Sequence, residues 1–199
     1  MYIPNSMDKE ETKAGDAALI ERAINGNNEA FDRLMQKHVP ICFQLARRFG
    51  LSADDASDLV QDAFFAAYRS LHRFNFSYSF STWITRILVN RISNFRRGVR
   101  RAKKIFWRPT DTDTTETVFE NMSEDDPHKS TEHSEFRTEL EKALNQLPKN
   151  QRMVFILFEI EGFKTREIAS IMDIPEGTVT SRLHHARLSL RKRLKNILT

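Results

Sequence analysis

The spacing of apolar residues is the feature that most constrains the fold of this 199-residue chain. Apolar side chains recur every three or four positions, which matches one side of an α-helix, and no segment alternates apolar and polar residues as a half-buried strand would. Glycine is scarce, with 6 residues, so few of these segments are interrupted. We therefore predict an all-α fold whose helices cover residues 16–25, 29–49, 53–73, 80–104, 134–146, 149–160, 165–172 and 176–196.

The predicted helix over 53–73 illustrates this pattern. Ser52 followed by Asp55 resembles a capping box, in which side chains bond to the free amides of the first turn. In the preceding helix, Pro40 lacks an amide hydrogen, so we expect a kink or a split there. The buried side of the helix over 53–73 is expected to consist of Ala56, Leu59, Val60, Ala63, Ala67 and Leu71.

Composition limits the class of protein. Hydrophobic residues make up 40% of the chain and charged residues 29%, which is typical of a water-soluble globular protein. No run approaches the roughly 20 apolar residues that cross a membrane, and the polar segment 1–13 does not resemble a signal peptide. A single cysteine, Cys42, excludes an internal disulfide and a zinc site built on cysteines. We expect a cytoplasmic protein.

Charge is segregated along the chain. Residues 86–108 contain nine basic residues and no acidic one, and residues 182–195 contain six basic residues and no acidic one. Between them, residues 110–135 contain nine acidic residues and one basic residue. This pattern predicts two surfaces for nucleic acid joined by a flexible acidic linker, although three solvated surfaces would also produce it. The predicted organisation is a disordered N-terminus over 1–15, helical domains over 16–105 and 134–199, and a linker over 106–133.

The last two predicted helices have the form of a helix-turn-helix. A short helix over 165–172 is followed by a turn ending at Pro175 and then by a longer basic helix. Hydroxyl, arginine and histidine side chains near the start of such a helix can reach phosphates and base edges in a major groove. The alternative is an ordinary helical hairpin with a basic exposed side. The candidate DNA-binding residues are Thr178, Thr180, Ser181, Arg182, His184, His185 and Arg187.

An acidic side with one aromatic residue is predicted on the helix over 53–73. Asp58, Gln61, Asp62 and Phe65 lie opposite the buried stripe. Acidic side chains repel DNA, so this side favours a protein partner such as a basic helix. A solvated acidic surface is the alternative.

Aromatic and basic residues occur together around the start of the helix over 80–104. Proteins bind single-stranded DNA by stacking aromatic rings on its bases and placing cationic side chains along its backbone. The alternative places the rings of Phe80 and Trp83 in the core. The group consists of Phe74, Phe76, Tyr78, Phe80 and Trp83, followed by Arg86, Arg91, Arg96 and Arg97.

Three motifs and the helix-turn-helix, in this order, resemble the sigma-70 family of RNA polymerase sigma factors. The motifs are Asp58-Leu59-Val60-Gln61-Asp62-Ala63-Phe64, Phe80-Ser81-Thr82-Trp83-Ile84 and Val89-Asn90-Arg91. The short form, with two modules and no domain between them, resembles the extracytoplasmic-function (ECF) group. The resemblance covers about residues 17–104 and 134–196. It implies a transcription initiation factor with no enzymatic activity.

Residues 16–105 resemble sigma region 2, which binds core RNA polymerase and the −10 promoter element. By this resemblance, the polymerase clamp docks on the acidic side formed by Asp58, Gln61, Asp62 and Phe65. Phe74 and Asn90 match positions that accept a base flipped from the melted −10 strand. The residues implied to lie along that strand or the adjacent duplex are Trp83, Arg86, Arg91, Arg96 and Arg97.

Residues 134–199 resemble sigma region 4, which reads the −35 element as duplex DNA. The positions that match its groove-facing residues are Ser181, Arg182, His184 and His185, and many relatives carry arginine at some of them. In the family, the connecting segment threads through polymerase channels that hold nucleic acid, so the acidic linker would mimic RNA there. A flexible solubilising tether is the alternative. Members of the ECF group are usually held inactive by an anti-sigma factor.

The sequence was also compared with two alternative classes of protein, a helix-turn-helix regulator and an enzyme. One is a helix-turn-helix regulator with residues 1–105 as a sensor or dimerisation domain, which would not require the acidic side at 58–65 or the aromatic and basic helix over 80–104. An enzyme would require a glycine-rich phosphate loop, a metal-ligand cluster or a nucleophile motif, and the sequence contains none. We therefore predict no cofactor and no metal. The resemblance implies core RNA polymerase, promoter DNA and an anti-sigma factor as partners.

Overall fold

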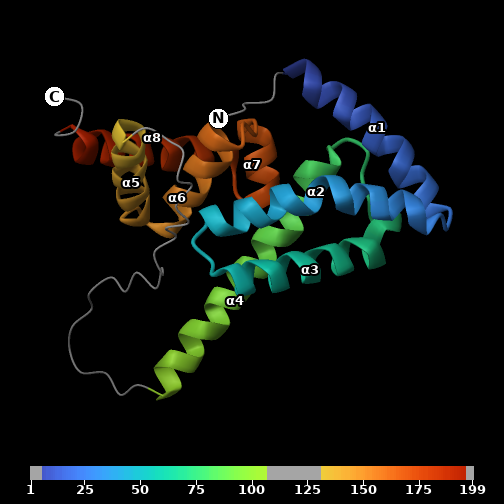
Figure 1. The fold of residues 1–199 in the computed structure, drawn as a ribbon, viewed down its shortest axis with the longest axis horizontal. Coiled ribbons are helices and arrows are strands. Elements are labelled where there is room, and N and C mark those ends of the chain that lie inside the picture. Colours follow the sequence, from blue (N-terminus) through green and yellow to red (C-terminus); the bar gives the residue numbers. More distant parts are fainter. Residues whose placement is uncertain (1–5, 107–130, 196–199) are drawn as a thin grey trace.

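The computed structural model describes residues 6–106 and 131–195, and these residues form helices joined by turns. No strand occurs within these two ranges, and the prediction of an all-α fold is confirmed. We call α1–α4 the N-terminal module and α5–α8 the C-terminal module (Figure 1). In chain order, the elements are α1 (Ser6–Ile24), α2 (Asn28–Arg48), α3 (Ala53–Ser70), η1 (Leu71–Arg73), α4 (Phe80–Phe106), α5 (Thr131–Asn145), α6 (Lys149–Phe155), η2 (Ile156–Ile160), α7 (Thr165–Met172) and α8 (Glu176–Leu194).

The helices differ from the predicted ones at several points. α1 begins at Ser6, so part of the segment predicted to be disordered is helical, because extending an existing helix costs far less than starting one. α2 continues through Pro40 without a break, and the predicted split is wrong. A proline removes one hydrogen bond, which a packed helix of 21 residues withstands. The segment 156–160 is a π-helix rather than the last turn of α6. The predicted acidic linker falls mostly on residues 107–130, outside the described residues.

Local capping explains where α2 and α3 begin. Asn27 accepts a hydrogen bond from the Ala30 amide at 3.0 Å, and Ser52 accepts one from the Asp55 amide at 3.1 Å. The Ser52 hydroxyl in turn donates to the Asp55 carboxylate at 2.7 Å, so the predicted capping interaction is confirmed. Each cap satisfies an amide that has no partner inside its helix.

A single hydrophobic cluster extends through both modules. All six residues predicted for the buried side of the helix over 53–73 are buried within it, five in α3 and Leu71 in η1. α4 packs against α3 in its own module and against α7 of the C-terminal module, and Figure 1 shows its first half enclosed between them. Leu88 and Ile92 of α4 and Ile168 and Ile171 of α7 are completely buried. A smaller cluster joins α5 to α8 through Leu144, Leu147, Leu190 and their neighbours. The two modules therefore share one core.

A buried polar cluster attaches α1 to α2. The Asp16 carboxylate, only 2% exposed, accepts hydrogen bonds from Lys37 Nζ at 2.7 Å and pairs with His38 Nε2 at 2.9 Å. Burial raises the pKa of Asp16, but the hydrogen bonds from His38 and Lys37 outweigh this effect and leave the pKa below its usual value. The ring of His38 also contacts Phe80, with ring centroids 5.0 Å apart. The cluster thus connects α1 to the start of α4.

We predict that Asp16→Ala lowers the free energy of unfolding by about 3 kcal/mol, because it leaves His38 buried without its partner. Lys37→Ala is the matched control, with an expected loss below about 1 kcal/mol because the Lys37 side chain is 39% exposed and water screens its charge. Since the folded pKa of Asp16 is lowered, its contribution is present above the unfolded pKa and is lost as pH falls through the folded pKa. Urea unfolding at pH 7 and pH 3 measures both effects, and equal losses for the two variants would contradict the prediction.

Candidate nucleic-acid interface

The helix-turn-helix is built from α7, a tight turn and α8. α7 ends at Asp173, which adopts a left-handed conformation with φ 54°, and the Ile174 amide donates to the Ala169 carbonyl at 3.1 Å. The hydrogen bond satisfies a carbonyl in the last turn of α7, and the left-handed residue redirects the chain toward the start of α8. Val179 is completely buried and anchors α8 to the core. The turn and the anchor fix the orientation of α8 relative to α7.

The exposed side of α8 carries most of the predicted DNA-binding residues. Ser181, His184 and His185 are exposed, and the two histidine rings lie edge to face with centroids 5.6 Å apart. Thr178 and Arg182 are partly buried, and the Thr180 hydroxyl donates to the Glu176 carbonyl of its own helix at 3.1 Å.

Arg187 differs from the other candidates on α8, because its guanidinium already has partners in the C-terminal module. Arg187 Nη2 lies 2.6 Å from a carboxylate oxygen of Glu159, and the guanidinium carbon lies 5.4 Å from the centre of the Phe158 ring. Both partners belong to the π-helix η2. Arg187 therefore connects α8 to η2, and its guanidinium is less available for a phosphate than sequence reasoning assumed.

The aromatic residues that precede and begin α4 form one cluster. Phe74 is 8% exposed, and its ring centroid lies 5.0 Å from that of Phe76, 5.3 Å from that of Trp83 and 6.4 Å from that of Phe80. The resemblance implied that Phe74 accepts a flipped base, but its ring is covered by these neighbours. Phe76, which is 43% exposed, offers the free ring surface. Period-based reasoning could not distinguish the two rings, because a short loop has no regular inward and outward alternation.

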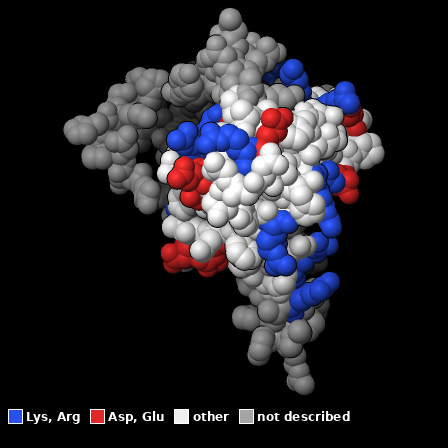
Figure 2. All heavy atoms as spheres, turned by 90° about the vertical axis from the view of Figure 1, so that its right-hand side faces the viewer, with Lys and Arg blue, Asp and Glu red and all other residues white. Residues whose placement is uncertain are grey.

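The arginines of α4 fall into two groups. Arg86, Arg91 and Arg97 are exposed, whereas Arg96 is partly buried and donates a hydrogen bond to the Phe49 carbonyl. Asn90 is exposed beside Arg91. Figure 2 shows Lys and Arg side chains gathered along the arm that points down, where the second half of α4 leaves the helical body. This arm is a basic surface.

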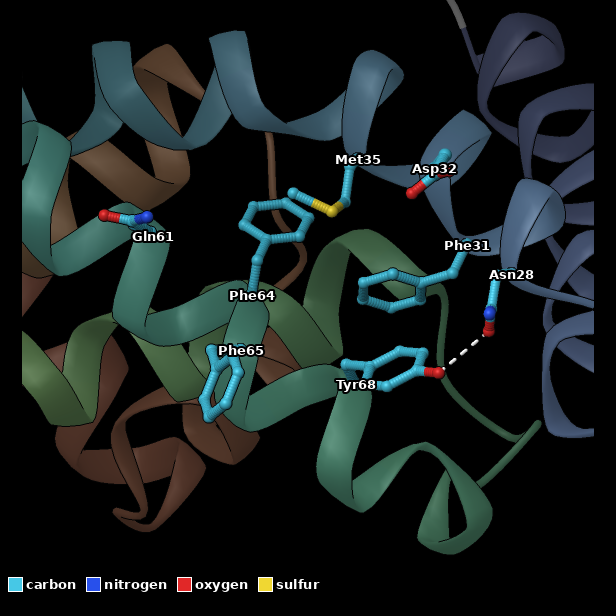
Figure 3. Close-up of a pocket in the computed structure, with 8 residues that line it drawn as sticks. All are labelled: Asn28, Phe31, Asp32, Met35, Gln61, Phe64, Phe65 and Tyr68. Atoms are coloured by element: carbon cyan, nitrogen blue, oxygen red, sulfur yellow. Dashed lines mark hydrogen bonds between the residues drawn. The ribbon is translucent and has the colours of Figure 1, made fainter. Parts of the chain in front are cut away.

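The predicted acidic side of α3 adjoins a groove. Asp58, Gln61, Asp62 and Phe65 are all exposed, and Phe65 is 65% exposed. A groove of about 410 Å³ lies between α2 and α3. In Figure 3 the Tyr68 ring lies below Phe31, its hydroxyl bonds to Asn28 at 2.8 Å, and Phe65 stands at the edge. The groove is lined by Asn28, Phe31, Asp32, Met35, Gln61, Phe64, Phe65 and Tyr68.

Sequence reasoning missed the α2 wall of this groove. Phe31 was assigned to the core, although its ring also lines the groove. Phe65 and Tyr68 are three positions apart and therefore lie on the same side of α3. This spacing was the feature of the sequence that could have indicated the groove. The groove has an apolar floor and acidic edges, a combination suited to an apolar side chain on a basic helix.

Within residues 6–106 and 131–195, no group of three or more His, Cys, Asp or Glu side chains could hold a metal ion. None of the described helices is long and apolar enough to cross a bilayer.

Comparison with known proteins identifies the family. Residues 34–102 match Sigma-70 region 2, and residues 137–190 match Sigma-70, region 4. The chain is 36% identical to the RNA polymerase sigma-H factor of Pseudomonas aeruginosa, over 94% of this chain and 97% of that protein. It is 31% identical to the ECF RNA polymerase sigma-E factor of Escherichia coli K12, over 92% of this chain and 96% of that protein.

Two solved structures have a similar fold over most of their length. One is CnrH in complex with the cytosolic domain of CnrY, with a TM-score of 0.64, 26% identity, and coverage of 92% of this chain and 98% of that chain. The other is the sigma factor RpoE of Bartonella quintana in complex with the anti-sigma factor NepR. Its TM-score is 0.60 at 25% identity, covering 83% of this chain and 96% of that chain.

The chain belongs to the sigma-70 family of RNA polymerase sigma factors, within the ECF group. It is therefore a transcription initiation factor that directs transcription from promoters. Sigma factors are not enzymes, so the family assignment agrees with the prediction of a non-catalytic protein.

We predict that Phe74→Ala lowers the free energy of unfolding by about 3 kcal/mol or more, because it leaves a cavity among three aromatic rings. Phe76→Ala should cost less than about 1 kcal/mol, because much of this ring is already in water. Urea unfolding followed by circular dichroism compares the two variants. Similar losses would mean that the loop has no distinct buried and exposed rings.

Proposed function

We propose that this sigma factor binds core RNA polymerase through α3 and promoter DNA through α4 and α8. The observation that carries the proposal is that three exposed surfaces of different chemistry occur on one chain. They are the acidic groove of α3, the aromatic and basic surface of α4, and the hydroxyl and histidine side of α8. The protein would act in the cytoplasm, where promoter DNA is found.

In this proposal, α8 reads the −35 element as duplex DNA. Ser181, His184 and His185 are free to enter a major groove, and the buried Val179 holds the helix in place. Thr178, Thr180 and Arg182 would add contacts to phosphates. Arg187 would act mainly by holding α8 against η2, since Glu159 already binds its guanidinium.

In the same proposal, α4 and the preceding loop hold the −10 element as a melted strand. The exposed ring of Phe76 offers a stacking surface, and the Phe74 ring packs edge to face against it. Arg86, Arg91 and Arg97 would neutralise phosphates along the strand. Asn90, exposed among these arginines, is placed to donate to and accept from the edge of an unstacked base.

The groove between α2 and α3 is proposed as the docking site for the polymerase. Asp58 and Asp62 supply negative charge beside a groove lined by Phe64 and Met35, with Phe65 at its edge. A basic helix carrying an apolar side chain satisfies both properties, as the resemblance to region 2 implies. An anti-sigma factor is a further proposed partner, because the similar RpoE chain of Bartonella quintana was solved in complex with the anti-sigma factor NepR.

In vitro transcription tests the proposal as a whole. Core RNA polymerase with the purified chain is given a pool of promoters whose −35 and −10 segments are randomised. Enrichment of two separated sequence elements among the transcripts is expected. Transcripts that share no element, or share only the upstream one, would contradict the assignment of two promoter-reading surfaces.

We predict that Asp62→Arg weakens binding to core polymerase by at least about 100-fold, because a like charge at a docked basic helix costs several kcal/mol. Binding of the full-length variant to −35 duplex DNA should not decrease. Glu21→Arg makes the same charge change at an exposed position on α1 and serves as the control. Native gel shifts with core polymerase measure the binding, and normal binding by the Asp62 variant would exclude this docking surface.

We predict that Asn90→Ala reduces open-complex formation roughly five- to tenfold, which is the usual effect of losing about one hydrogen bond. Closed-complex affinity should change less than twofold, because the base is unstacked only after melting. Permanganate reactivity of the −10 thymines reports opening, and filter binding at low temperature reports the closed complex. Asn25→Ala, at an exposed position in the turn after α1, is the control. Equal losses at both stages would exclude a base-contacting role for Asn90.

A further inference from the structure

The loop of residues 74–79, here called the aromatic loop, joins η1 to α4 and carries the exposed ring of Phe76. The Ser77 amide donates to the Asn75 side-chain oxygen at 2.9 Å, and the Tyr78 amide donates to the Asn75 carbonyl at 3.1 Å. All hydrogen bonds of this loop within the described part of the chain join positions at most four apart. Hydrogen bonds therefore shape the aromatic loop locally but do not fix its place against the helices.

Ring contacts provide that attachment. The ring centroid of Phe74 lies 5.0 Å from that of Phe76 and 6.4 Å from that of Phe80 in α4. Phe80 is only 1% exposed, and its ring centroid lies 5.0 Å from that of His38 in α2. The rings of these four residues therefore form a continuous path from the exposed Phe76 to the buried His38.

Asp16 sets the orientation of the His38 ring. His38 Nε2 lies 2.9 Å from Asp16 Oδ2, and the two side chains are only 3% and 2% exposed. A hydrogen bond requires a defined direction between donor and acceptor, whereas apolar contact does not. The bond to Asp16 therefore holds the plane of the imidazole at a fixed angle to the Phe80 ring, which is 57° in this structure. A pair of apolar side chains would fill the same space without fixing that angle.

The helix α1 also lies directly beside the aromatic loop (Figure 1). A crevice of about 20 Å³ separates them, with Asp16 and Ile20 on the side of α1. The rings of Phe74, Phe76 and Phe80 line the crevice on the side of the loop. Its volume is roughly that of a single water molecule, so it is too small to receive a base. α1 therefore supports the aromatic loop rather than forming a base pocket with it.

We propose that Asp16 and His38 are positioning residues for the −10 strand. They hold Phe80, and through it the aromatic loop, in the arrangement that presents the Phe76 ring to an unstacked base. Groups that form a binding site must be held within about 0.5 Å of their working positions, and the bonds inside the loop do not supply that attachment. Both residues are buried, so their effect on DNA passes through the rings. The inference rests on the function proposed above for the aromatic loop.

A double variant, Asp16→Ala with His38→Leu, removes the pair while retaining the fold. The two substitutions keep roughly the summed volume of the side chains, and they leave no buried group without its partner. Asp16→Ala alone lacks this compensation, because His38 stays buried. The urea midpoint of the double variant should therefore stay within about 0.5 M of the wild-type midpoint.

Two single variants separate the ring from the hydrogen bond. His38→Gln keeps a side-chain amide that donates to Asp16 but removes the ring that contacts Phe80. Asp16→Asn keeps the ring, and its amide still forms a hydrogen bond with the imidazole. The first variant is therefore expected to disturb the aromatic loop and the second to leave it in place. These two variants decide the question if the double variant does not fold.

Promoter opening is measured with holoenzyme assembled from core RNA polymerase and each full-length variant. The template is a promoter enriched from the randomised pool, and permanganate reactivity of its −10 thymines reports opening. The double variant and His38→Gln are expected to lower opening about fivefold, the usual scale of one lost aromatic contact. Closed-complex affinity should change less than about twofold, because α8 reads the duplex and is unaltered. Asp16→Asn should open the promoter within about twofold of wild type, since its hydrogen bond is kept.

Hydrogen exchange read by mass spectrometry gives a second measurement that does not depend on DNA. The amides of Ser77 and Tyr78 report the order of the aromatic loop. They should exchange at least about threefold faster in the double variant and in His38→Gln, while the amides of α3 keep their wild-type rates. Unchanged exchange in the loop would overturn the positioning role.

Phe76→Ala separates this inference from the function on which it rests, because it removes the stacking ring and leaves Asp16 and His38 in place. If Phe76→Ala lowers opening but His38→Gln and the folded double variant open normally, the positioning role is wrong and the function of the loop stands. If Phe76→Ala opens the promoter normally, the stacking function is wrong and the positioning role fails with it. An equal loss in Asp16→Asn and in the double variant would also overturn the inference.

Discussion

The packing of α4 between α3 and α7 is the interaction on which the rest of the structure depends. The buried residues Ile84, Leu88 and Ile92 face the interior, and the same helix carries Asn90 and Arg91 on its exposed side. α4 therefore contributes buried side chains to the shared core of both modules and also carries the proposed strand-binding surface. Any change in the packing of α7 acts directly on the helix that is proposed to hold DNA.

The order of helices and the sides they expose could be predicted from the sequence, because both follow from local rules. Apolar residues recur every three or four positions along α3. This spacing alone distinguishes the buried side of the helix from its exposed side, whichever helix packs against it. The same rule placed Asp58, Asp62 and Phe65 on the surface. Ser52 likewise defined the start of α3 through a contact only three positions away.

Contacts between distant parts of the chain were beyond sequence reasoning. The Thr82 hydroxyl and the Glu167 carboxylate are 85 positions apart, and no periodicity relates them. The groove beside Tyr68 also depends on two helices packing at a particular angle. Arg96 and Arg187 appeared equivalent to the other arginines, yet each is held by a partner outside its own helix. A basic residue in the sequence is therefore not by itself a free positive charge.

The length and continuity of α4 have a consequence for how this protein can vary. A helix of 27 residues is about 40 Å long, roughly the length of 12 base pairs of duplex DNA. Adding or removing one residue in its middle would rotate the basic arm by about 100° relative to the aromatic end. The two ends of the surface would then face different directions. α4 is thus expected to accept many substitutions on its exposed side over evolutionary time, but very few insertions or deletions.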